Sequence, residues 1–86
     1  MRVSVISAER AVFEGEVDSV VAPAYDVLVG ILPRHAPFMT LLGKGIVKIT
    51  GSRGGGIHRL EVAGGFLQVA RDVVRIVAGS AAPAAS

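Results

Sequence analysis

The side chains that could do chemistry are few in this sequence, and they are widely spaced. The two histidines, His35 and His58, lie 23 positions apart, and no spacing of His, Asp and Glu resembles a metal-binding motif. The sequence contains no cysteine, which excludes thiolate chemistry and disulfides. Glu14 and Glu16 flank Gly15 in an expected turn, where paired carboxylates are usually exposed. We therefore expect no catalytic centre, no metal site and no cofactor.

A glycine-rich run at residues 51–56 is the other candidate for chemistry, because glycine loops can cradle phosphates. It reads Gly-Ser-Arg-Gly-Gly-Gly, which matches neither a Walker loop nor a dinucleotide-binding fingerprint. No Gly-x-Ser-x-Gly nucleophile elbow occurs elsewhere in the sequence. We interpret the run as a flexible hairpin connection. His58 alternates with Leu60 and Val62, which favours a partly buried structural side chain over a ligand.

One loop is less easily explained as a simple connection. Pro33 and Pro37 bracket the basic pair Arg34 and His35. Each proline restricts its own φ and biases the preceding residue toward extended conformations. The resulting loop is stiff, and a stiff loop loses less entropy when it binds a partner. Its chemistry leaves two interpretations open, a docking loop or a corner between two sheets.

Composition limits the kinds of protein to consider. The 86 residues suffice for one domain, and 51% are hydrophobic, so a modest core is expected. Nine Lys and Arg against seven Asp and Glu give a net charge of +2, spread along a chain with four aromatic residues, which disfavours nucleic-acid binding. The N-terminus does not resemble a signal peptide, and the most apolar run, at residues 27–33, is too short to span a bilayer. Any membrane contact is therefore expected to go through a partner.

The elements that would position these side chains follow a period of two. Val3 and Val5 share one face of the first run, and Val47 and Ile49 share one face of a later run, with Lys48 on the other. Gly, Pro and Asp residues end such runs at roughly regular spacing, which is typical of an all-β sandwich or barrel. Nine runs can be counted, at residues 3–5, 11–14, 17–22, 27–32, 38–42, 45–50, 57–63, 66–70 and 73–78. We expect one domain over residues 1–78 and a flexible C-terminal tail over residues 79–86.

The loop between the two prolines also carries a family resemblance. Residues 30–37 read Gly-Ile-Leu-Pro-Arg-His-Ala-Pro, which is similar to the Gly-Ile-Leu-Pro-Gly-His-Ala-Pro signature of the epsilon subunits of F-type ATP synthases. Residues 5–15 resemble the opening segment of that family, and residues 45–49 resemble its Gly-x-x-x-Ile strand. Residues 64–69 resemble its Gly-Gly-x-x-x-Val segment, so the resemblance runs in order over residues 1–78.

The resemblance implies a fold and a role. The fold would be a β-sandwich of about ten strands in two packed, mainly antiparallel sheets. The role would be that of a non-catalytic rotor subunit in the central stalk, which couples the proton-driven c-ring to the gamma subunit for ATP synthesis. Its partners would be gamma, the polar loops of the c-ring and, through the complex, the alpha and beta subunits. Its place would be peripheral, on the cytoplasmic face of a bacterial inner membrane, with no cofactor.

The resemblance also implies where docking occurs. Residues 26–32 match the loop and strand that lead to the c-ring, and His35 matches the signature histidine, in the region that contacts gamma and the ring. Leu28 stands where the family usually has an acid, so we predict that Asp26 supplies the missing carboxylate; reversing its charge should then change rotor assembly. Arg34 replaces the usual glycine. The docking residues expected from the match are Asp26, Leu28, Arg34, His35, Pro37 and Phe38.

Most members of this family continue into a two-helix C-terminal hairpin that can inhibit ATP hydrolysis and, in some bacteria, binds ATP. This sequence ends at Ser86 and resembles the short form without a C-terminal helical domain, for which we expect coupling without inhibition or ATP sensing. The alternative is a biotinyl or lipoyl carrier domain, also a small β-rich sandwich. Such a domain needs one exposed lysine, and Lys44 between Gly43 and Gly45 is turn-like but lacks the usual flanking residues.

Overall fold

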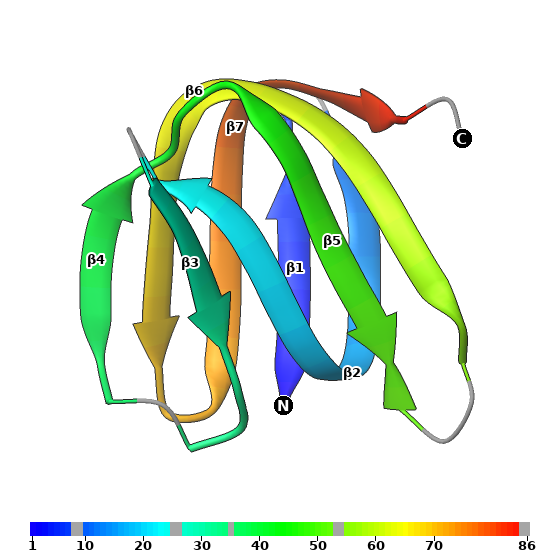
Figure 1. Ribbon diagram of the computed structural model, residues 1–86, viewed down its shortest axis with the longest axis vertical. Helices are drawn as coiled ribbons and strands as arrows, with labels where there is room; N and C mark the ends of the chain where they lie inside the picture. Colours follow the sequence, from blue (N-terminus) through cyan, green and yellow to red (C-terminus); the bar gives the residue numbers. More distant parts are fainter. Residues whose placement is uncertain (8–9, 25–26, 35, 53–54, 85–86) are drawn as a thin grey trace.

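A computed structural model describes residues 1–7, 10–24, 27–34, 36–52 and 55–84. The chain forms strands joined by short turns and loops, and no α-helix is present in the described part (Figure 1). The strands are β1 (Arg2–Ile6), β2 (Ala11–Ala24), β3 (Val27–Ile31), β4 (Phe38–Leu41), β5 (Gly45–Gly51), β6 (Ile57–Ala70) and β7 (Val73–Pro83). The all-β fold class expected from the period-two pattern is confirmed.

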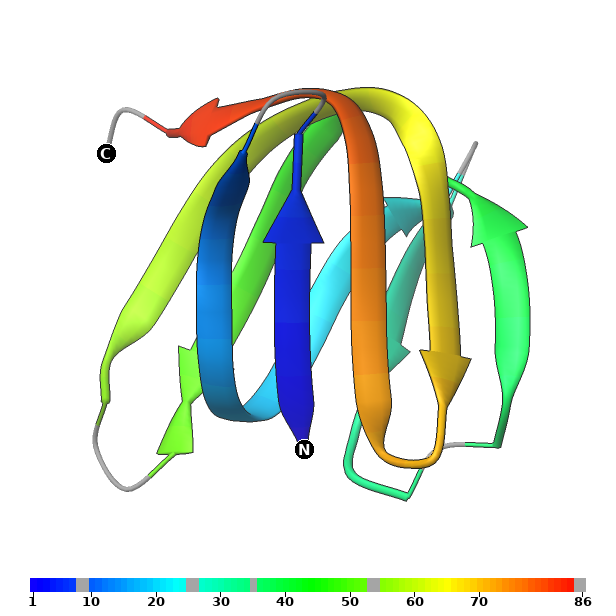
Figure 2. The same cartoon turned by 180° about the vertical axis from the view of Figure 1, so that it is seen from behind.

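The strands form two layers that share their longest strands. Hydrogen bonding runs in the order β1-β7-β6-β5-β2-β3, β1 also pairs with β2, and β4 pairs with β6. The first half of β2 pairs with β1, and its second half pairs with β3 and β5. Similarly, β6 pairs first with β5 and later with β4. Figures 1 and 2 show these long strands curving from one layer into the other.

We name the layers by their central strands. The β5 layer contains β3, β5, the second half of β2, the first half of β6 and the end of β7, whereas the β1 layer contains β1, β4 and the remaining halves. Counting β2, β6 and β7 in both layers gives ten strand segments, which agrees with the expected ten-stranded sandwich. The chain makes them from seven continuous strands, since the runs at 11–14 and 17–22 are one strand, as are those at 57–63 and 66–70.

A bend in β2 and a bend in β6 allow each strand to continue from one layer into the other, so that two predicted runs form one strand. In β6 the bend lies at Gly64 and Gly65, whose φ angles of 70° and 110° favour glycine. In β2 the pairing with β5 shifts register between Val17 and Ser19, as at a β-bulge, which bends a strand and increases its twist. The glycines of β6 therefore mark a bend, and not the strand end that the sequence pattern predicts.

The expected flexible tail over residues 79–86 is wrong for residues 79–83, because β7 continues to Pro83. Ala81 pairs with Val62 and Pro83 with Leu60, and the Ala84 N–H donates to the Arg59 carbonyl oxygen at 2.9 Å. The small side chains of this segment carry no alternation that reveals a strand, but their backbone groups can complete the edge of the β5 layer. Residues 85–86 lie outside the described part of the chain.

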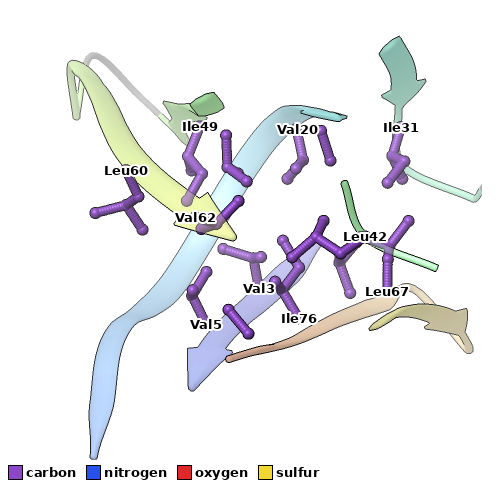
Figure 3. Packing of buried hydrophobic residues seen from close by; sticks show 14 of the residues in the cluster. Val3, Val5, Val20, Ile31, Leu42, Ile49, Leu60, Val62, Leu67 and Ile76 are labelled. Atoms are coloured by element: carbon purple, nitrogen blue, oxygen red, sulfur yellow. The ribbon is translucent and has the colours of Figure 1, made fainter. Parts of the chain in front are cut away.

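The core lies between the two layers and is built by the alternation seen in the sequence. Val3 and Val5 are fully buried, as are Val47 and Ile49, so both predicted inward faces are confirmed. Figure 3 shows the buried side chains converging between the strands. Burial of each such side chain contributes about 1.5–3 kcal/mol, and no described polar or charged residue is buried among them. The core cluster consists of Val3, Val5, Val17, Val20, Ala22, Ile31, Leu42, Val47, Ile49, Leu60, Val62, Leu67, Val69, Val74, Ile76 and Ala78.

Candidate docking surface

The edge strands β3 and β4 leave one corner of the sandwich open. Within the described residues, β3 pairs only with β2 and β4 only with β6, and the two lie near each other in both views (Figures 1 and 2). Large apolar side chains gather on these strands and on the residue after β3, each between 63% and 67% exposed. We call this set the apolar corner; its members are Val27, Leu28, Leu32, Met39 and Leu41.

An apolar row extends the corner across the outer face of the β1 layer. Leu41 pairs with Phe66, Phe66 with Val77, and Val77 with Ile6, so four strands contribute adjacent apolar side chains. Phe66 is 37% exposed, and Val77 and Ile6 are half-buried. Contiguous exposed apolar surface on a small domain commonly marks a contact with another protein. The corner and row together form a candidate docking surface.

The loop after β3 is held in place by a carboxylate from another part of the chain. The Arg34 N–H donates a hydrogen bond to Asp72 Oδ1 at 2.9 Å. Arg34 has a φ of 66°, in the left-handed region that costs a non-glycine residue about 1–2 kcal/mol. This conformation explains why a glycine would fit the position well. Pro33 and the Asp72 hydrogen bond therefore fix the Arg34 backbone next to the turn between β6 and β7.

The same hydrogen bond changes the acidity of Asp72. The Arg34 N–H stabilises the charged carboxylate and lowers the pKa of Asp72 below its usual value of 3.8. A pKa that is lower in the folded state contributes stability above the unfolded value. That contribution is lost as the pH falls from 3.8 through the folded pKa. The attachment of the loop is thus an acid-sensitive contact.

We predict that Asp72→Asn reduces the part of the stability that is lost below pH 3.8. Asparagine can still accept the Arg34 N–H through its side-chain oxygen but does not titrate. Urea unfolding of both proteins across the acid range would measure this difference. Asp72→Ala is the matched variant, since it also removes the acceptor, and it should speed amide hydrogen exchange at Arg34 at neutral pH. An unchanged acid profile in both variants would contradict the prediction.

The structure describes four of the six expected docking residues. Leu28, Arg34 and Pro37 are exposed, whereas Phe38 is half-buried and packs against the core. Leu28 lies near the start of β3, and the other three follow its end, so β3 separates them. Asp26 and His35 fall outside the described residues.

Sequence reasoning overlooked four members of the apolar corner, namely Val27, Leu32, Met39 and Leu41. A signal for Met39 was present. In a strand, neighbouring residues point to opposite faces, so the apolar neighbours Phe38 and Met39 cannot both face the core. Only the position of β4 at an edge shows that its outward residues remain uncovered by this chain.

No candidate centre for chemistry emerges in the described part of the chain. There, no three His, Cys, Asp or Glu side chains come together in a way that could hold a metal ion. His58 is exposed, because it lies near the start of β6, and its ring packs on Phe13 with ring centroids 4.9 Å apart. Among the described residues, no helix is long and apolar enough to cross a membrane.

The sequence is similar to curated ATP synthase epsilon chains from several bacteria. It is 42% identical over 77 residues to the epsilon chain of Leptospira borgpetersenii, which covers 90% of this chain and 59% of the relative. It is 44% identical over 81 residues to that of Dehalococcoides mccartyi, covering 94% of this chain and 56% of the relative. The chain thus spans less than two thirds of the length of these relatives.

Two solved assemblies contain chains of the same fold. One is the mitochondrial ATP synthase OSCP/F1/c-ring of Euglena gracilis, where the match has a TM-score of 0.86 and 22% identity and covers 94% of this chain and 51% of that chain. The other is the central stalk and c-ring of the Tetrahymena thermophila mitochondrial ATP synthase, with a TM-score of 0.76 and 16% identity over 96% of this chain and 66% of that chain. At these identities the likeness shows the fold.

These similarities do not support the carrier-domain alternative. Lys44 lies exposed in a bend between β4 and β5. The relatives and structural neighbours named above are ATP synthase chains, and the family model for the ATP synthase delta/epsilon chain, beta-sandwich domain, matches residues 1–84. Matched over nearly its whole length, this chain belongs to the ATP synthase delta/epsilon beta-sandwich family.

Proposed function

We propose that this chain is a non-catalytic subunit of the central stalk of an F-type ATP synthase, and that it couples the c-ring to the gamma subunit during ATP synthesis. The observation that carries the proposal is the apolar corner on a domain of this family. Five large apolar side chains are more than 60% exposed there, beside two edge strands. Such a surface is unfavourable in water and is explained by a partner that covers it.

The partners follow from the family and its neighbours. Gamma would cover the apolar corner, and the polar loops of the c-ring would meet the adjacent loops, with alpha and beta reached through the complex. The named assemblies of Euglena and Tetrahymena, an F1/c-ring complex and a central stalk with c-ring, support this context. The bacterial relatives support a peripheral place on the cytoplasmic face of the inner membrane.

The architecture suits a part that transmits torque. Hydrogen bonding closes around β1, β7, β6, β5 and β2, so the two layers are joined by continuous strands as well as by the core. A close-packed core resists deformation. The Arg34 backbone, two residues after Leu32 of the apolar corner, is tied to the β6–β7 turn, so the chain next to the candidate docking surface is held to the rigid body. A load applied at the surface would therefore move the whole domain.

Co-purification tests the proposal. The chain is expressed with an affinity tag beside the gamma, alpha and beta subunits of the same synthase, and complexes are isolated at moderate salt. We expect gamma to be retained directly, and alpha and beta to be retained only when gamma is present. Retention of none of these subunits would overturn the proposed function.

A further inference from the structure

A small pocket with two arginines lies outside the apolar corner. It has a volume of about 220 Å³ and opens beside the turn that joins β6 to β7. Its lining is Gln68, Ala70, Arg71, Val73 and Arg75.

Strand register explains how the pocket forms. Gln68 pairs with Arg75, and Ala70 pairs with Val73, on the antiparallel strands β6 and β7. Their neighbours Val69 and Val74 are buried, so these four side chains point to the outer face of the β1 layer. Ala70 and Val73 are short, and the longer polar side chains around them leave the space between.

The polar groups around this space have no partner within the described residues. No hydrogen bond or ion pair is present there for the side chains of Gln68, Arg71 or Arg75. Arg2, on the same face, behaves differently, since its guanidinium pairs with Glu14 at 2.7 Å. Two guanidinium groups and one amide are thus left with free donors. Guanidinium groups bind carboxylates in a bidentate geometry, which makes a carboxylate the best match.

The pocket is continuous with the candidate docking surface. Met39 of the apolar corner pairs with Gln68, which in turn pairs with Arg75, so these three residues lie in one row across β4, β6 and β7. A polypeptide that covers Met39 and Leu41 would therefore also reach the pocket. We propose that the pocket receives an aspartate or glutamate side chain of the protein that covers the apolar corner, which in the proposed function is gamma.

This inference rests on the proposed function and adds a specific contact to it. The apolar surface would supply most of the binding free energy, because burying apolar area is non-directional. A carboxylate between Arg71 and Arg75 would set the register, because paired charges at an interface fix orientation and disfavour wrong alignments. The expected partner segment therefore carries an acidic residue next to apolar ones.

The test measures binding of purified gamma to the intact chain. Arg75→Gln removes one guanidinium, and Arg59→Gln is the matched control, because Arg59 is exposed and lies in the part of β6 that belongs to the other layer. We expect Arg75→Gln to raise the Kd about ten-fold or more, since hydrogen bonds to charged groups are among the stronger ones. Arg59→Gln should change the Kd by less than about two-fold, as expected for a charge outside the interface. Both variants should unfold at the temperature of the unmodified chain.

Salt dependence and charge reversal complete the test. Between about 50 mM and about 300 mM NaCl, the affinity of Arg75→Gln for gamma should fall less than that of the unmodified chain. Salt screens the attraction between Arg75 and the partner carboxylate, and the variant lacks this attraction. Arg75→Glu should be rescued by one Asp→Lys or Glu→Lys variant of gamma. If gamma binds and Arg75→Gln behaves like Arg59→Gln, the pocket proposal is wrong and the proposed function stands. If the unmodified chain does not bind gamma, both are wrong.

Discussion

Replacing Gly65 with alanine is expected to lower the free energy of unfolding by about 3–5 kcal/mol, from backbone strain and steric overlap together. Gly65 has a φ of 110°, which side-chain-bearing residues rarely adopt. A Cβ there would overlap the Val77 carbonyl oxygen and lie 2.8 Å from the Ala78 Cα. These are backbone atoms of the paired strand β7, so the conflict can be relieved only by separating the strands at the bend.

The consequence extends beyond the bend. The Gly65 carbonyl oxygen accepts the Leu42 N–H at 3.0 Å, which attaches the segment after β4 to β6. A small domain has a total stability of about 0.05–0.15 kcal/mol per residue. A loss of the expected size would therefore remove a large share of the total stability. Urea unfolding followed by circular dichroism measures the effect.

Two other glycine substitutions serve as controls for Gly65. Gly64 has a φ of 70° but nothing within 4 Å of an added Cβ, so Gly64→Ala should cost only the strain of about 1–2 kcal/mol. Gly30 has neither a positive φ nor a close neighbour, and Gly30→Ala should leave stability nearly unchanged. Equal destabilisation by Gly65→Ala and Gly64→Ala would show that the close approach of β7 is unimportant.

The double variant Met39→Glu with Leu41→Glu is expected to weaken binding to gamma about 30-fold or more, the size of a hot-spot loss of about 2 kcal/mol. Both side chains are nearly two thirds exposed on β4, so the isolated domain loses little packing when they change. In the complex they would be covered, and a buried unpaired carboxylate is costly. Affinity for purified gamma and thermal unfolding of the variant should be measured together.

Ile57→Glu provides the matched control for this variant. Ile57 is also apolar and 51% exposed, but it lies at the start of β6, on the strand end that pairs with β5. Its replacement adds one carboxylate outside the apolar corner, where the double variant adds two within it, and should leave the affinity for gamma within about two-fold. Loss of binding in both proteins would point to a general charge effect. Retained binding in the double variant would remove the apolar corner from the interface.

The alternation of side chains could be predicted from the sequence because it depends on neighbouring residues. Val3 and Val5 face the core because a strand repeats every two residues, and Val47 and Ile49 follow the same rule. The all-β class follows equally from local pattern. The ordered motifs of residues 1–78 also led to the right family.

The glycines show where local pattern was insufficient. Gly15 and Gly64 look like stops between short strands, yet both lie inside long strands that cross between layers. Whether a glycine ends a strand or bends it depends on whether another strand continues to pair beyond it. For Gly65 that strand is β7, and the same strand continues through small residues at 79–83 that have no strand pattern of their own.

The docking surface depends most on tertiary structure. A small all-β domain, its inward residues and its family could be predicted from the sequence, since each follows from order and spacing along the chain. Only the folded chain brings Arg34 to Asp72, across 38 positions, and Met39 beside Gln68 and Arg75. A strand lies at an edge when no further strand pairs with its free side. Which distant segments pair depends on the whole sheet, so the exposure of an edge strand cannot be read from its own residues. The side chains that could do chemistry, His35, His58 and the paired glutamates, can be found in the sequence. The docking surface can be recognised only when β3 and β4 are placed at the open corner.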